Sequence, residues 1–147
     1  RAEKQHKKSN ELMKQTYDIE ATMFGILKGT SALTAALSGG IYAGERPLNS
    51  EKEDVAINTI ALSQDFEPQL GTSNVNIHVP DKKVTIGGIQ QNVEDRARLK
   101  ALSDIVLTAI RGSKVAGLKI VVENQATLNE PEIKQHYVNI RVNWIIH

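Results

Sequence analysis

Hydrophobic and polar positions alternate most regularly in the C-terminal stretch of the chain, residues 134–147. This stretch contains no Gly and no Pro, and its period of two is typical of a β-strand with one buried face. It is roughly twice as long as the usual strand of about 5–6 residues. We therefore expect it to extend beyond its sheet and to offer unpaired backbone groups to a neighbouring chain. The expected core face carries Val138, Ile140, Val142 and Trp144, and the face toward a neighbour or solvent carries Tyr137, Asn139, Arg141 and Asn143.

Apolar residues recur at helical spacing in other parts of the chain. Over residues 17–27 they predict an N-terminal helix, and residues 31–37 can add a short second one. A longer helix is expected between Asn92, a suitable N-cap, and Gly112, a residue type that commonly follows the last helical turn. The core-facing seam of this helix consists of Leu99, Leu102 and Val106.

Shorter strands are predicted between these helices and the C-terminal strand. Neighbouring strands joined by short loops usually pair antiparallel. The chain is therefore expected to form an α+β fold, with a mostly antiparallel sheet, a long helix packed on one face and an N-terminal helix. We predict one domain over residues 16–147, preceded by a basic arm or helix extension over residues 1–15. The expected strands are residues 41–44, 55–62, 74–79, 84–86 and 118–124, with a loop over 63–73 and a hairpin connection over 125–131.

Composition narrows the picture only slightly. The 147 residues suit a single domain, and a net charge of +1 indicates no strong bias toward nucleic acid or membrane. The absence of cysteine excludes disulfides and thiolate metal sites. No apolar run approaches the roughly 20 residues needed to span a bilayer, so we expect no membrane partner.

The search for catalytic and cofactor motifs points to no enzyme and no cofactor. The four histidines show none of the usual metal-binding spacings, and the Gly87-Gly88 pair lacks the Lys and Ser/Thr of a phosphate-binding loop. No ordering of Ser, His and Asp is distinctive. Clustered carboxylates fall at expected loops and helix starts, where solvation and capping explain them. We therefore predict no catalytic, cofactor-binding or metal-binding residue.

Positive charge gathers at two places, and each has two interpretations. Residues 1–15 carry five basic residues against two acidic ones, and form either a solvated segment or an arm that contacts nucleic acid or an acidic protein. On the long helix, Arg96 and Arg98 either face solvent or meet an acidic partner. Aromatic residues do not interleave with these positions, as they usually do in proteins that bind single-stranded nucleic acid.

Several local motifs resemble one family. A Gly39-Gly40-Ile41-Tyr42 entry precedes a Glu45-Arg46-Pro47 loop, and the segments V-A-I-N-T (55–59) and N-V-N-I-H-V-P-D (74–81) come before the long helix and a closing hairpin. This layout resembles the tail-terminator and tail-completion (head–tail joining) proteins of tailed bacteriophages.

The resemblance implies a structural virion protein. In that family an α+β subunit forms a ring, commonly a hexamer, at the tail end or in the neck, and the ring lines a channel for DNA. The implied partners are further copies of the chain and the connector, portal-side or tail-tube proteins. The implied location is the tail or neck of the virion, after assembly in the host cytoplasm. Charged residues expected to contact a neighbour are Glu45, Arg46, Arg96 and Arg98.

Overall fold

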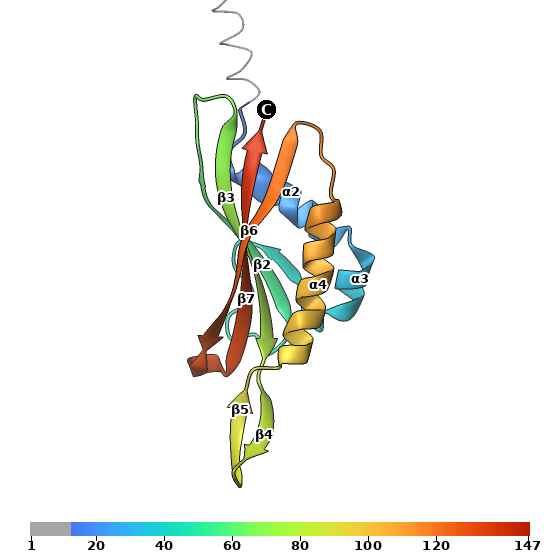
Figure 1. Ribbon diagram of the computed structural model, residues 1–147, viewed down its shortest axis with the longest axis vertical. Coiled ribbons are helices and arrows are strands. Elements are labelled where there is room, and N and C mark those ends of the chain that lie inside the picture. The colour runs from blue at the N-terminus through green and yellow to red at the C-terminus, as the bar shows by residue number, and fades with distance from the viewer. Residues whose placement is uncertain (1–12) are drawn as a thin grey trace, which may run out of the picture.

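The computed structural model describes residues 13–147, which form an elongated α+β subunit with one layer of helices against one sheet (Figure 1). Most of the predicted basic arm therefore lies outside the described residues. None of the helices in residues 13–147 is both long and apolar enough to cross a membrane. The helices are α2 (Thr16–Lys28), α3 (Ser31–Ala36), α4 (Arg96–Gly112) and the single 3-10 turn η1 (Pro131–Ile133).

A five-stranded sheet forms the other layer, in the order β1-β2-β3-β7-β6. All neighbours in it are antiparallel except β1 and β2, which run parallel. A separate two-stranded sheet pairs β4 with β5 and projects from one end of the subunit (Figure 1). The strands are β1 (Ile41–Ala43), β2 (Asp54–Leu62), β3 (Gln69–Pro80), β4 (Lys82–Ile86), β5 (Ile89–Val93), β6 (Leu118–Glu130) and β7 (Gln135–Ile146).

The hydrophobic core lies between the helices and one face of the sheet. In β7 every second residue points inward, so the alternation in the sequence becomes a fully buried stripe. Helix α4 supplies the facing seam, and Trp144 is the largest side chain that is fully buried. The seven expected core residues are all buried: Leu99, Leu102, Val106, Val138, Ile140, Val142 and Trp144.

The prediction that the C-terminal strand extends beyond its sheet is wrong. Strand β7 is an interior strand, and it pairs with β3 on one side and β6 on the other along its whole length. One edge of the sheet is the short β1, and the other is β6, which is 13 residues long where the sequence predicts seven. The second half of β6 is polar and shows no alternation that would predict a strand. Its residues lie at the edge of the sheet, where a strand needs no buried face.

Two further predictions are corrected around the long helix. Asn92 does not cap it, since Asn92 lies in β5 and pairs with Lys83. The helix begins at Arg96, and the Asp95 side chain accepts a hydrogen bond from the Arg98 N–H at 3.2 Å. Strand β3 also begins earlier than expected, at Gln69, so only the first part of the predicted loop over 63–73 remains a loop.

Candidate interaction surfaces

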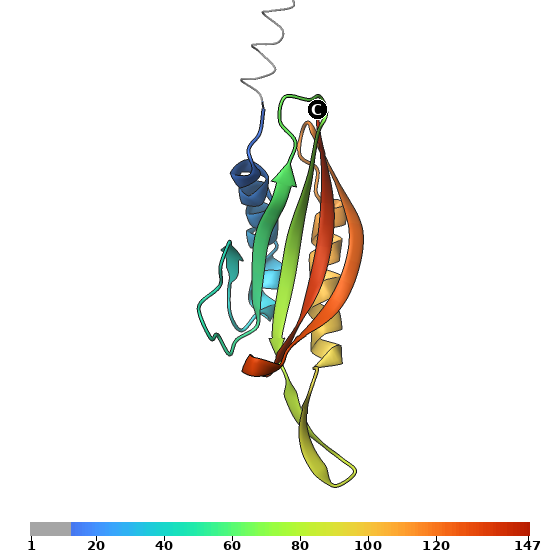
Figure 2. The same ribbon diagram turned by 90° about the vertical axis from the view of Figure 1, so that its left-hand side faces the viewer.

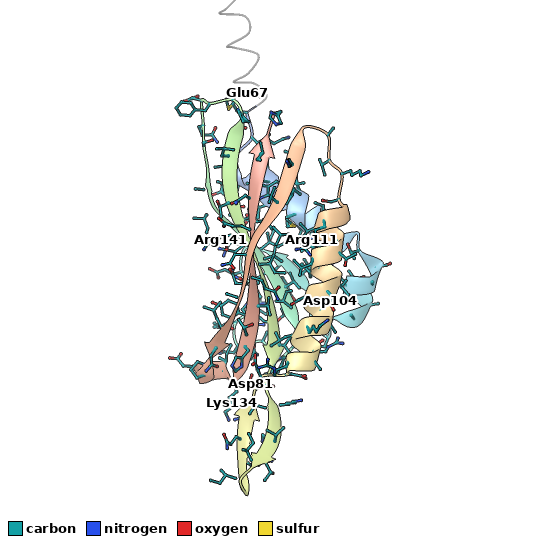
Figure 3. All side chains as sticks on the ribbon, in the orientation of Figure 1. Glu67, Asp81, Asp104, Arg111, Lys134 and Arg141 are labelled. Carbon is teal, nitrogen blue, oxygen red and sulfur yellow. The ribbon has the colours of Figure 1, made fainter. Side chains whose placement is uncertain are left out.

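One face of the five-stranded sheet is left uncovered by the helices of the described chain (Figure 2). The alternation that buries one face of β7 turns Tyr137, Asn139, Arg141 and Asn143 toward this open face. All four residues expected to face a neighbour or solvent therefore share one surface. Arg141 lies on the opposite side of the sheet from α4 and its Arg111 (Figure 3). We call the uncovered surface the open face.

Amide side chains line the centre of the open face and bind one another across three strands. The Asn139 Nδ2 donates to Asn76 Oδ1 at 2.7 Å and to Asn74 Oδ1 at 3.1 Å. The Asn74 Nδ2 in turn donates to Asn58 Oδ1 at 3.1 Å. Such mutual hydrogen bonds fix the side chains before a partner arrives, which lowers the entropy cost of binding. The surface is thus polar and preorganised.

An imidazole and a phenol lie together at one end of the open face. The ring centroids of His78 and Tyr137 are 4.9 Å apart, and the His78 Nδ1 is 2.9 Å from the Glu130 Oε1. Burial lowers the pKa of His78, and the nearby Arg46 charge lowers it further, against the opposing effect of Glu130. His78 is therefore held mainly neutral near pH 7, which is typical of a structural imidazole.

The long free edge of β6 is the second candidate surface. Its 13 residues pair with β7 on one side only, within the described chain. Val121 and Leu128 on this strand are exposed apolar residues, and a register irregularity interrupts the pairing between Val122 and Asn124. An edge of this length presents a row of backbone donors and acceptors on which another strand can pair.

Arg46 has a different role from the one expected. Its guanidinium donates to Asp54 Oδ2 at 3.0 Å and to Gln135 Oε1 at 2.6 Å, and its side chain is only 11% exposed. The Gly40 N–H donates to the other carboxylate oxygen of Asp54 at 2.9 Å. Arg46 therefore pins its own loop onto the end of the sheet, and the prediction that it meets a partner is corrected. Neighbouring Glu45 remains exposed.

Arg98 is also engaged inside the subunit. It binds both carboxylate oxygens of Glu53 and the carbonyl oxygen of Ala36, so it links α4 to α3 and to the start of β2. The hydrogen bond to Arg98 lowers the pKa of Glu53, and the same bond raises the pKa of Arg98. Arg96 is different, because it is exposed and bonds only to nearby Glu94 among the described residues.

A groove of about 690 Å³ lies between α4 and the strands β6 and β7. Leu99 and Leu107 from the helix and Thr127 from β6 line it, and the buried hydroxyl of Ser103 has no hydrogen-bond partner there among the described residues. His136 at its end is paired with Asp81, at 2.6 Å. Residues 13–147 contain no group of three or more His, Asp or Glu side chains placed to hold a metal ion.

Sequence reasoning missed the amides contributed by β2 and β3 to the open face. The alternation in residues 74–79 was a signal for them, since it sends Asn74, Asn76 and His78 to the same side. What the sequence could not show is the register that sets Asn76 opposite Asn139 and His78 opposite Tyr137.

Comparison with known proteins finds a structural likeness without a match in sequence. No protein-family model and no curated protein sequence matches the chain. Among solved structures, the chain is similar to a chain in the virion of a native gene transfer agent (GTA) particle, with a TM-score of 0.58. The two share 11% sequence identity over 86% of this chain and 92% of that chain. At this identity the likeness establishes a common fold, which extends over nearly the full length of both chains.

Proposed function

We propose that this chain is a structural protein of a phage-like virion, built to assemble with further copies of itself. The observation that carries the proposal is the likeness to a virion chain, because it covers nearly all of both chains. The motifs that resemble tail-terminator and tail-completion proteins lead independently to the same class of particle. The proposal assigns no catalytic step and no cofactor to the chain.

The finer proposal is a ring at the end of the tail or in the neck, with six copies as the common size in the resembled family. In this role the ring ends growth of the tail tube or joins it to the connector, and DNA passes through it without sequence-specific contacts. The partners are then portal-side, connector or tail-tube proteins. The site of action is the virion, after assembly in the host cytoplasm.

Two surfaces of the subunit support assembly. A closed ring needs heterologous contacts, in which different surfaces of neighbouring copies meet. The free edge of β6 can accept a strand through backbone hydrogen bonds, and the preorganised amides around Asn139 offer a second, polar surface. Strand addition and a flat polar face suit contacts between subunits better than they suit capture of a small molecule, which needs a concave pocket.

The proposal is tested by light scattering of the purified chain and of two matched variants. The double variant Val121→Asp/Leu128→Asp places charges along the β6 edge, where they disfavour strand addition. The control Ala101→Asp/Thr108→Asp adds the same charge to exposed positions of α4, away from that edge. We expect a discrete oligomer for the native chain and the control, and a smaller species for the edge variant with an unchanged circular dichroism spectrum.

A compact monomer at every concentration would contradict the proposal if it also fails to bind added phage connector and tail-tube proteins. If the edge variant and the control form oligomers of equal size, the chain assembles without using the β6 edge.

A further inference from the structure

The hairpin formed by β4 and β5 extends beyond the rest of the subunit (Figures 1 and 2). Its turn is Gly87-Gly88, and both glycines have positive φ angles, 58° and 80°. Two consecutive positive φ values characterise the type I′ turn, whose twist suits a two-residue hairpin and favours glycine. The glycine pair in the sequence therefore favours formation of this hairpin.

The two faces of this hairpin differ in character. In antiparallel pairs the opposed residues share a face, and the register sets Ile86 opposite Ile89 and Lys82 opposite Val93. One face therefore carries Val84, Ile86, Ile89 and Val93, together with Lys82 and Gln91. The other face carries only polar side chains, which are Lys83, Thr85, Gln90 and Asn92.

The apolar face of the hairpin is only partly covered within residues 13–147, since Val84 and Val93 are half-buried whereas Ile86 and Ile89 near the tip are exposed. No residue of the hairpin is buried against the described chain, and Ile86 and Ile89 are 52% and 65% exposed. An isolated two-stranded hairpin is at best marginally stable in water, and one with a hydrophobic face gains stability by packing that face on something else. The alternation of residues in this hairpin thus indicates a binding surface.

A second exposed apolar site lies at the opposite end of the long axis of the subunit. It is the loop over residues 63–68 between β2 and β3, at the end where Figure 3 labels Glu67. Phe66 in this loop is 71% exposed, and Leu70 just beyond it is also exposed. We call this site the Phe66 loop.

The charges at the two ends are complementary. The hairpin carries Lys82 and Lys83 and no acidic residue, whereas the Phe66 loop carries Asp65 and Glu67 and no Lys or Arg. All four charged side chains belong to exposed residues. These opposite charges favour contact between a hairpin and a Phe66 loop. They disfavour contact between two hairpins or between two Phe66 loops, because like charges would then meet.

We propose that the apolar face of the β4–β5 hairpin of one copy docks on the Phe66 loop of a second copy. The inference rests on the proposed function and identifies a contact between its subunits. The two surfaces lie at opposite ends of one subunit and so meet only between copies. This contact is heterologous, and repeated around an axis it closes a ring, or without closure it stacks subunits end to end.

Unique cysteines test this contact, because the native chain contains none. The variants Ile89→Cys and Phe66→Cys are prepared separately and treated with a short bismaleimide crosslinker, alone and as an equal mixture. We expect a crosslinked dimer in the mixture and little product from either variant alone. The control pairs Thr108→Cys, on the exposed side of α4, with Phe66→Cys, and it should give only background crosslinking.

A second measurement checks the charges. Lys82→Glu, on the same face of the hairpin as Val84 and Ile86, should weaken association by roughly tenfold or more, because it sets like charges against each other. Combining it with Glu67→Lys should restore association by recreating the opposite charges. Restoration is a readout that simple loss of folding would not produce.

The outcomes separate this inference from the proposed function. A dimer formed by Ile89→Cys alone would mean that hairpins meet each other, and would overturn the inference. An oligomer seen by light scattering without any mixed crosslink would also overturn it, while leaving the proposed function standing. A chain that stays monomeric up to millimolar concentration, with connector and tube proteins present, would defeat both.

Discussion

Two antiparallel hairpins of this chain show the same alternation of residues and have opposite surroundings. In the β6–β7 hairpin the inward residues of β7 are buried beneath α4, and Trp144 is fully enclosed. In the β4–β5 hairpin the equivalent apolar positions, such as Ile86 and Ile89, remain exposed. A period of two therefore predicts a strand with one apolar face, but it does not say whether the same chain or another one covers that face.

The described residues thus comprise a part whose apolar face is buried within the fold and a hairpin whose apolar tip is exposed. Changes in the first part should lower the free energy of unfolding. Changes in the second should leave that free energy nearly unchanged and affect association.

Trp144→Ala should have the largest effect, because it removes the largest fully buried side chain from the hydrophobic core. We expect the free energy of unfolding to fall by about 3–5 kcal/mol, through lost burial and the cavity left behind. The indole N–H also donates to Ser73 Oγ at 2.9 Å, so that hydroxyl loses a partner. Urea denaturation followed by circular dichroism measures the change. A loss as small as that of a surface substitution would show that β7 is not the centre of the core.

Arg46→Ala should come next, because it leaves the buried Asp54 carboxylate without its ion-pair partner. We expect a loss of about 2–3 kcal/mol, somewhat less than for a fully enclosed pair, since Arg46 keeps some access to water. The double variant Arg46→Ala/Asp54→Asn removes the charge as well and should recover part of the loss. If the two substitutions prove additive in urea denaturation, the pair does not hold the loop onto β2.

Acidification should destabilise the fold through His78, beside Tyr137 of β7. The folded state lowers the pKa of His78 from its ordinary value of 6.5, so the unfolded chain binds the proton more readily. The contribution of His78 to the free energy of unfolding is fully present above pH 6.5. It is lost as the pH falls through the lower pKa that His78 has in the folded state. His78→Gln should flatten the fall of the melting temperature between about pH 7 and pH 5. The control His147→Gln, at an exposed terminal residue, should keep the native slope. An unchanged slope in His78→Gln would contradict this explanation.

Ile86→Ser/Ile89→Ser in the projecting hairpin should have the smallest effect on folding. We expect the free energy of unfolding of the isolated subunit to change by no more than about 0.5 kcal/mol, because these side chains are already exposed. Association measured by light scattering should nevertheless weaken, whereas Thr85→Ser/Gln90→Ser on the polar face should leave it intact. A large loss of folding stability in the first variant would mean that the hairpin belongs to the core.

The α+β class and the main elements could be predicted from the sequence because their patterns are local. The seam around Leu102 and the alternation around Trp144 each reflect one element buried on one side. The order of strands could not be predicted in the same way. Placing β7 between β3 and β6 depends on pairings between residues far apart in sequence, such as Gly71 with Trp144.

The polar parts of the candidate surfaces were hardest to predict. In the sequence, Arg46 and Arg98 cannot be distinguished from exposed cations. Only the fold shows that Asp54 pairs with Arg46 and that Glu53 pairs with Arg98. The second half of β6 lacks the apolar alternation of a strand because residues 13–147 leave its inner side chains exposed, including Gln125 and Thr127. Apolar and polar residues therefore alternate less regularly in a strand at an open edge than in a strand in the middle of a sheet.

Electron microscopy of the purified chain tests most directly whether this subunit is built to assemble with its own copies. We expect closed rings of one size, or end-to-end stacks of them, at concentrations where light scattering reports an oligomer. Fields of single elongated particles at every concentration, unchanged by added connector or tail-tube protein, would contradict it.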